Sequence, residues 1–165
     1  MSNLEPPDEH HLRSARGWLG LGNHLEANEE LERIRPLHNA HPDVLELRCQ
    51  IYAGFKNWEL CFDIACALAQ LVPERSMGWI YRSQALHELN RTMEAFDLLL
   101  PVADRFSREW KIPFDLACYC ARLRRITDAR GWLERAFLLG DSKSLKRMVL
   151  DNPDLEPFWG EMGKE

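Results

Sequence analysis

Small and apolar residues recur along this chain with a spacing of 34 residues. One column of positions holds only small residues, namely Ala15, Cys49, Ser83 and Ala117, and a second, twelve residues later, holds Ala27, Cys61, Ala95 and Ala129. Two wholly apolar columns follow, consisting of Leu31, Ala65, Leu99 and Leu133 and of Ile34, Leu68, Val102 and Ala136. The first apolar column lies four residues after the second small column, and the second apolar column lies three residues later. Steps of three and four residues are those of one face of an α-helix. The pattern therefore predicts a repeated helical unit.

A polar turn signal interrupts each copy between its two small columns. The signals are Gly22-Asn23, Lys56-Asn57, Asn90-Arg91 and Arg124-Arg125. The sequence thus predicts eight helices without strands, near residues 8–20, 25–38, 43–55, 58–71, 75–88, 93–105, 111–122 and 128–139. A small residue in each helix of a pair lets the two helices approach closely, so the small columns are interpreted as packing positions.

The repeat resembles that of the tetratricopeptide repeat family, whose helices pair as antiparallel hairpins with a period of 34. The third copy, WIYRSQALHELNRTMEAFDLLLPVA, carries the resemblance most clearly, with Trp79 at the start of its first helix and Ser83 and Ala95 in the small positions. The second copy keeps Tyr52 and ends with Pro73. The resemblance implies an all-α, right-handed superhelical solenoid of four antiparallel helix pairs.

The end of the solenoid requires a cover, because its last helix pair would otherwise expose an apolar face to water. Leu145, Met148 and Val149 form an apolar stripe after Gly140, which predicts a C-terminal capping helix. The expected organisation is a flexible N-terminus at 1–7, four repeats within 8–140 and a capping helix and tail at 141–165. The four repeats are expected at 8–41, 42–75, 76–109 and 110–140.

The overall charge argues against a nucleic-acid partner. Lys and Arg number 21 against 26 Asp and Glu, a net charge of −5, which opposes the phosphate-neutralising surface that such binding needs. The sequence contains neither an apolar run of about 18 residues for a membrane span nor a secretory signal. Five cysteines without paired spacing indicate reduced thiols. These features predict a cytoplasmic protein that binds neither membranes nor nucleic acid.

No residue pattern in the chain indicates catalysis or a bound cofactor. His38 and His41 have a spacing that could place two imidazoles on one face, but they lie at a turn before Pro42, and we expect no metal. Cys118 and Cys120 lie about 200° apart around a helix, which separates their thiols. Nucleophile, zinc-protease and phosphate-binding motifs are missing from the sequence. The chain is therefore expected not to be an enzyme.

The family resemblance implies that a partner peptide or segment lies in a concave groove lined by the first helix of each pair. Helical periodicity assigns to this groove Arg13, Arg16, Gln50, Ile80, Tyr81, Gln84, His87, Phe114 and Arg122. Tyr81 is the expected central anchor, and the arginines favour an acidic or mixed ligand. A small secretion-type chaperone and a self-assembling structural module remain alternatives, and the partner and oligomeric state stay open.

Overall fold

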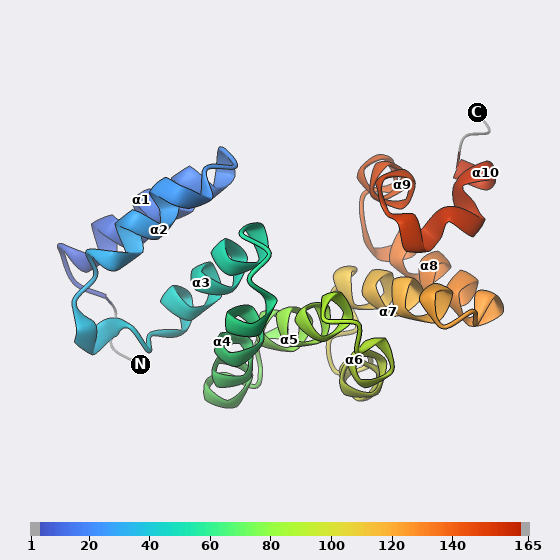
Figure 1. Ribbon diagram of the computed structural model, residues 1–165, viewed down its shortest axis with the longest axis horizontal. Helices are drawn as coiled ribbons and strands as arrows, with labels where there is room; N and C mark the ends of the chain where they lie inside the picture. The colour runs from blue at the N-terminus through green and yellow to red at the C-terminus, as the bar shows by residue number, and fades with distance from the viewer. Residues whose placement is uncertain (1–3, 163–165) are drawn as a thin grey trace. The chain divides into compact units, whose positions relative to one another are not determined.

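The computed structural model describes residues 4–162, and this part of the chain is helical without a β-strand (Figure 1). The prediction of an all-α fold is therefore confirmed for the described residues. The chain divides into two compact units, and the division falls within α5, between Ala85 and Leu86. Each unit is described separately below. The right-handed superhelical course and the division into four repeats stay predictions.

The first unit is built from two helix pairs and the start of α5. Its helices are α1 (Asp8–Gly20), α2 (His24–Glu32), η1 (Pro36–His38), α3 (Pro42–Gly54), α4 (Trp58–Leu71) and α5 (Ser76–Glu88). Helix α1 packs against α2, α3 packs against α4, and α3 also contacts both helices of the first pair. Tyr81 and Ala85 of α5 join the core cluster of α3 and α4. This arrangement is that of successive antiparallel hairpins.

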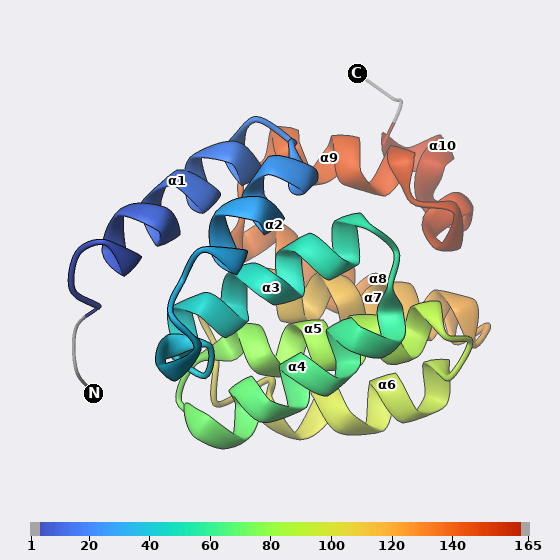
Figure 2. The same ribbon diagram turned by 60° about the vertical axis from the view of Figure 1, so that its left-hand side comes forward.

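The second unit is centred on α7. Its elements are α6 (Thr92–Leu99), η2 (Leu100–Val102), α7 (Lys111–Arg122), α8 (Ile126–Leu139), α9 (Ser142–Asp151), η3 (Pro153–Phe158) and α10 (Trp159–Met162). Helix α7 packs against α6, α8 and η3, and α9 contacts α8, η3 and α10. Figures 1 and 2 both place α9 and α10 on one side of the α7 and α8 pair.

Both columns of small residues lie in the interior of the fold. All eight have no exposed surface: Ala15, Cys49, Ser83, Ala117, Ala27, Cys61, Ala95 and Ala129. The two apolar columns that follow them are buried as well. The interpretation of these columns as packing positions is therefore confirmed.

The backbone repeats at the same interval of 34. The residues with positive φ are Gly22 (74°), Lys56 (56°), Asn90 (62°) and Arg124 (61°), which lie 34 positions apart at the turn inside each predicted copy. A left-handed residue ends a helix by letting the chain reverse direction, and glycine adopts this conformation most easily. Only the first copy has glycine there, yet the other three turns adopt the same conformation.

Three features of the helices differ from the sequence prediction. Helix α2 ends at Glu32 instead of continuing to residue 38, and α6 ends at Leu99 instead of near 105. Pro36 and Pro101 follow these ends, each within a short 3₁₀ helix. Proline has no amide hydrogen to donate to the preceding turn of an α-helix, which favours an end of the helix before it. The capping helix is present as α9, but η3 and α10 after it were not predicted. Of the described helices, none is long and apolar enough to cross a membrane.

A buried carboxylate ties the start of α1 to the segment after α2. Asp8 has no exposed surface and accepts hydrogen bonds from the side chain and the backbone amide of Arg35 and from His38. Burial by itself raises the pKa of Asp8, but the hydrogen bonds from His38 and Arg35 outweigh it and lower the pKa to about 2. Asp8 is therefore ionised at neutral pH, and its hydrogen bonds join the N-terminal end of α1 to the segment that follows α2.

Candidate binding surfaces

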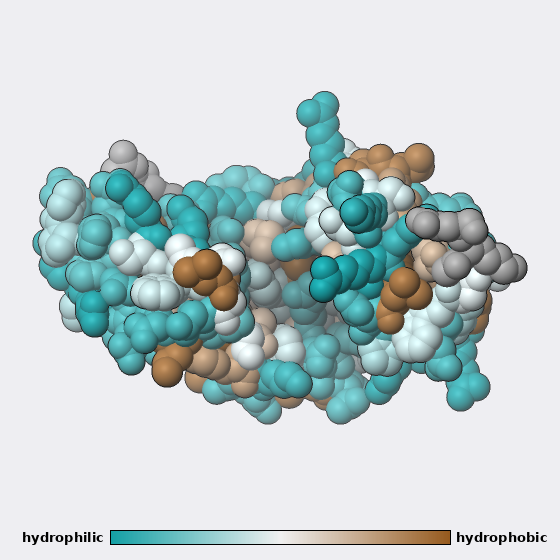
Figure 3. Space-filling view, turned by 90° about the horizontal axis from the view of Figure 1, so that it is seen from above, coloured by the Kyte–Doolittle hydropathy of each residue, from teal (hydrophilic) through white to brown (hydrophobic). Residues whose placement is uncertain are grey.

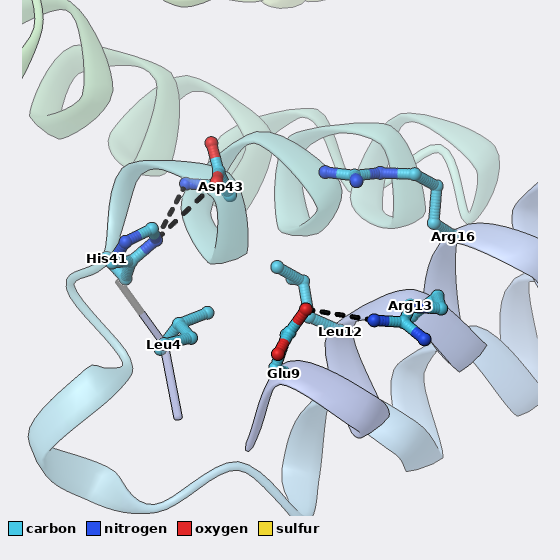
Figure 4. A pocket seen from close by; sticks show the side chains of 7 residues that line it. All are labelled: Leu4, Glu9, Leu12, Arg13, Arg16, His41 and Asp43. Carbon is cyan, nitrogen blue, oxygen red and sulfur yellow. Dashed lines mark hydrogen bonds and ion pairs between the residues drawn. The ribbon is translucent and has the colours of Figure 1, made fainter. Parts of the chain in front are cut away.

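A pocket of about 330 Å³ opens between the starts of α1 and α3 in the first unit (Figure 4). Its lining consists of Leu4, Glu9, Leu12, Arg13, Arg16, His41 and Asp43. Glu9, Leu12 and Arg16 of α1 lie three and four positions apart, which places them on one helical face, and Arg13 lies beside them. Leu4 and Leu12 are nearly buried and give the pocket an apolar base. The pocket thus contains two of the arginines that were predicted from the sequence to line a groove.

The charges around this pocket are not all neutralised. Glu9 pairs with Arg13 at 2.9 Å, and Asp43 pairs with Arg75 at 2.5 Å. The hydrogen bond to Asp43 raises the pKa of Arg75 above its ordinary value. Arg16 is exposed and extends toward α3, and it has no hydrogen bond or ion pair with any residue between 4 and 162 (Figure 4). The pocket can therefore offer one unpaired guanidinium to an acidic group above an apolar base.

The remaining predicted groove residues of the first unit differ in accessibility. Ile80 is only 1% exposed, so it contributes to packing and is not accessible to a partner in this structure. Tyr81 is half-buried against the core cluster of α3 and α4. Gln50 and Gln84 are half-buried.

In the second unit, the chain's own C-terminal segment contacts two of the predicted groove residues. Asp154 of η3 accepts a hydrogen bond from Nε2 of His87 at 2.8 Å and another from Arg122 at 3.1 Å. Asn152 donates to Sγ of Cys118 at 3.3 Å. Phe114, another predicted groove residue, is 5% exposed. His87 and Arg122 are thus both close together and already engaged by an acidic residue.

The position of His87 is fixed on both sides of its ring. Nδ1 lies 3.0 Å from the hydroxyl of Thr92, and the ring centroid lies 4.9 Å from that of Tyr119. A carboxylate can only accept a hydrogen bond, so Nε2 donates to Asp154, and Nδ1 is the ring atom that faces Thr92. His87 therefore acts as a rigid donor to the carboxylate of Asp154.

The cysteines behave as packing residues. Cys61 donates to the carbonyl of Cys49 at 3.6 Å across the α3 and α4 crossing, and the hydrogen bond with Cys61 and burial both raise the pKa of Cys49. Burial also raises the pKa of Cys118, with the nearby carboxylates of Asp115 and Asp154 adding to the effect, and raises that of Cys120 to about 11. With raised pKa values, the thiols of Cys49, Cys118 and Cys120 are protonated at neutral pH and weakly nucleophilic. Within residues 4–162, no three His, Cys, Asp or Glu side chains are grouped to hold a metal ion.

Exposed apolar side chains are distributed in small groups. On the face that Figure 3 shows, separate hydrophobic groups stand among hydrophilic ones. The most exposed large apolar side chains include Leu21 at 78% and Leu138 at 86%. Leu138 borders a mainly apolar pocket of about 460 Å³ between α8 and α10, where Arg130 pairs with Glu161.

Comparison with known proteins supports the fold alone. No family model matches the sequence, and no curated protein is similar to it. Among solved structures, TTC0263, a thermophilic TPR protein of Thermus thermophilus, aligns with a TM-score of 0.80 and 17% identity over 94% of this chain and 83% of its own. The RS-1 ArsTM double mutant of MamA aligns with a TM-score of 0.69 and 14% identity over 97% and 92% of the two chains. PilF of Pseudomonas aeruginosa aligns with a TM-score of 0.51 and 12% identity over 93% and 97%.

These likenesses confirm the resemblance to tetratricopeptide repeat proteins at the level of the fold. The identities of 12 to 17% are too low to transfer a function from any of these proteins to this chain.

Proposed function

We propose that the protein is a non-catalytic interaction module that binds an acidic or mixed segment of a partner protein. The observation that carries this proposal is the unpaired Arg16 beside an apolar base formed by Leu4 and Leu12. An acidic side chain of a ligand would pair with Arg16 while a neighbouring apolar side chain covers the two leucines. The tetratricopeptide-like fold supports the proposal, because stacked helix pairs present extended binding surfaces.

The charge of the pocket decides which ligands fit it. Both acidic residues of the pocket already have arginine partners, so a basic ligand would have to displace Arg13 or Arg75. An acidic ligand displaces no ion pair at Arg16. Electrostatic attraction of this kind changes mainly the association rate and its salt dependence. The proposal includes a cytoplasmic location, in which five unpaired cysteines remain reduced.

The test compares protein capture by the wild type and by two single variants. Arg16→Ala removes the free guanidinium, and Arg33→Ala removes an exposed arginine on the same unit that pairs with Glu30 outside the pocket. Proteins retained from native cells would be identified, and the affinity of the strongest partner would then be measured with purified protein at low and high salt. We expect Arg16→Ala to weaken that affinity about tenfold at low salt and Arg33→Ala to leave it within about twofold.

Equal weakening by the two arginine variants would contradict the proposal, because the effect would then follow net charge and not the pocket. Affinity that is independent of salt in the wild type would contradict it as well. Stable self-association of the purified chain, abolished by Arg16→Ala, would replace the foreign partner by a second copy of this protein.

A further inference from the structure

The most informative contact outside the pocket of the first unit is the one between the C-terminal segment and α7. Both carboxylate oxygens of Asp154 are used: Oδ2 lies 2.8 Å from His87 and Oδ1 lies 3.1 Å from Arg122. The Asp154 side chain is only 12% exposed. Leu155 and Phe158 of the same segment are 0% and 1% exposed. The segment is therefore held by the paired carboxylate of Asp154, which we call the clamp, and by two buried apolar side chains.

This segment has the chemistry of the ligand proposed for the first unit. It presents an acidic side chain to an arginine and places a large apolar side chain directly beside it. Pro153 and Pro157 lie within η3, and they leave the segment with fewer backbone donors than an α-helix of equal length. Its polar ties to α5 and α7 include the side-chain contacts of Asp154 and Asn152.

A second latch lies at the end of the segment. Arg130 of α8 forms two hydrogen bonds of 2.7 Å with Glu161 of α10, and Trp159 donates to the carbonyl of Val149 at 2.8 Å. The Arg130 and Glu161 side chains are about half exposed, which makes this latch weaker than the buried clamp on Asp154. Of these two polar contacts, the one at Asp154 is the more deeply buried, and it links η3 to α5 and α7.

We propose that residues 152–158 are an internal ligand that closes the α7 surface and can be released from it without unfolding of α7 and α8. In the closed state, the segment occupies His87, Cys118 and Arg122, so these residues are withheld from a partner. In the open state, they form a second site for an acidic, proline-flanked segment. The role of the open site rests on the proposed function, whereas the opening itself does not.

Two cysteines of α7 make the opening measurable. Cys118 lies under Asn152 and is 4% exposed, whereas Cys120 has no exposed surface and no hydrogen bond to the segment. Release of the segment would uncover Cys118 alone, because residues two positions apart face different sides of a helix. Unfolding of α7 would uncover both thiols together. Cys120 is therefore an internal control for unfolding.

The experiment measures alkylation of Cys118 and Cys120 in the full chain by fragmentation mass spectrometry, with each rate divided by the rate in the urea-unfolded chain. Asp154→Asn removes the negative charge of the Asp154 side chain, and Arg122→Gln removes the positive charge that pairs with it. Asp151→Asn is the matched control, because Asp151 is an exposed residue at the end of α9 that pairs only with Arg147. We expect both clamp variants to speed Cys118 labelling at least about tenfold, with Cys120 and the Asp151→Asn protein unchanged. Arg122→Gln is the decisive variant, because it keeps the Asp154 carboxylate, which by its charge raises the pKa of Cys118 and slows its alkylation.

Parallel acceleration of Cys118 and Cys120 would overturn the proposal, because the segment would then be a permanent part of the fold. Unchanged Cys118 labelling in the Arg122→Gln protein would overturn it too. The assay contains no partner, so its outcome is separate from that of the Arg16 test. A labelled peptide of residues 150–160 serves as the ligand probe, and we expect it to bind the Asp154→Asn protein at least about tenfold more tightly than the wild type.

Discussion

Replacement of Gly78 by alanine tests the helix packing of the first unit at its closest point. Gly78 lies in the first turn of α5, against Ala69 of α4. A Cβ atom at Gly78 would lie 2.6 Å from the backbone nitrogen of Ala69 and 2.9 Å from its Cα. These atoms belong to the backbone of a helix, so they cannot rotate out of the way. The two helices would have to move apart.

The magnitude follows from two opposing effects. Alanine in place of an unconstrained helical glycine stabilises a protein by about 0.5–1 kcal/mol. Forcing apart a well-packed contact costs about 1–3 kcal/mol, and a clash with backbone lies at the upper end. We therefore expect Gly78→Ala to lower the free energy of unfolding by about 1–2 kcal/mol, and the melting temperature by about 2–8 °C.

The matched control is Gly17→Ala in α1 of the same unit. Gly17 lies inside its helix, is exposed, and has no atom within 4 Å of the added Cβ. The Gly17→Ala substitution should raise the free energy of unfolding by about 0.5–1 kcal/mol. Urea unfolding followed by circular dichroism at about 222 nm measures both variants, and equal m-values with the wild type are required for the comparison.

A double variant sharpens the test. Ala69→Gly removes only the side-chain atom that lies 3.1 Å from the added Cβ and leaves both closer backbone atoms in place. It should therefore not restore the stability of Gly78→Ala. Full restoration, or a Gly78→Ala protein as stable as Gly17→Ala, would refute the close backbone approach of α4 and α5.

Two further predictions concern stability. Ala95→Leu should lower the free energy of unfolding by about 1–3 kcal/mol, because Ala95 is fully enclosed, and thermal unfolding equal to wild type would contradict the packing described for α6. Asp8 has a folded-state pKa of about 2 against an ordinary value of 3.8, so the stability it contributes is complete above about pH 4 and disappears as the pH falls to about 2. Asp8→Asn should be less stable than wild type at neutral pH, and the difference should shrink between about pH 4 and pH 2 in denaturant titrations.

Much of the fold could be predicted from the sequence because close helix crossings restrict residue size. Ala95 and Cys61 lie where a larger side chain would not fit, and the same restriction recurs every 34 residues. The turns were predictable for a related reason, since Asn90 and Gly22 tolerate a left-handed conformation. The early ends of α2 and α6 carried a signal as well, in Pro36 and Pro101, but the apolar periodicity continues past both prolines and favoured longer helices.

The accessibility of the candidate binding surface could not be predicted in the same way. Helical periodicity shows which residues share a face, but it does not show what lies opposite that face. Residues Ile112 to Ala121 of α7 are all buried, because α6, α8 and η3 surround this helix. Periodicity alone placed Phe114 in an open groove, whereas in the structure it is enclosed. The segment that helps to enclose α7 has no helical repeat of its own, so its position could not be read from the periodicity.

Arg16 and Arg122 show why a positive charge on a helix face is not sufficient evidence for an acidic partner. Both were predicted to attract such a ligand. Arg122 already has an acidic partner in Asp154, which lies 32 residues later in the chain, whereas Arg16 has none among residues 4–162. A guanidinium attracts a foreign carboxylate strongly only where the folded chain does not supply one. The Arg16 pocket is therefore the first place to test for a partner, and the α7 surface becomes a candidate only after Asp154 is released.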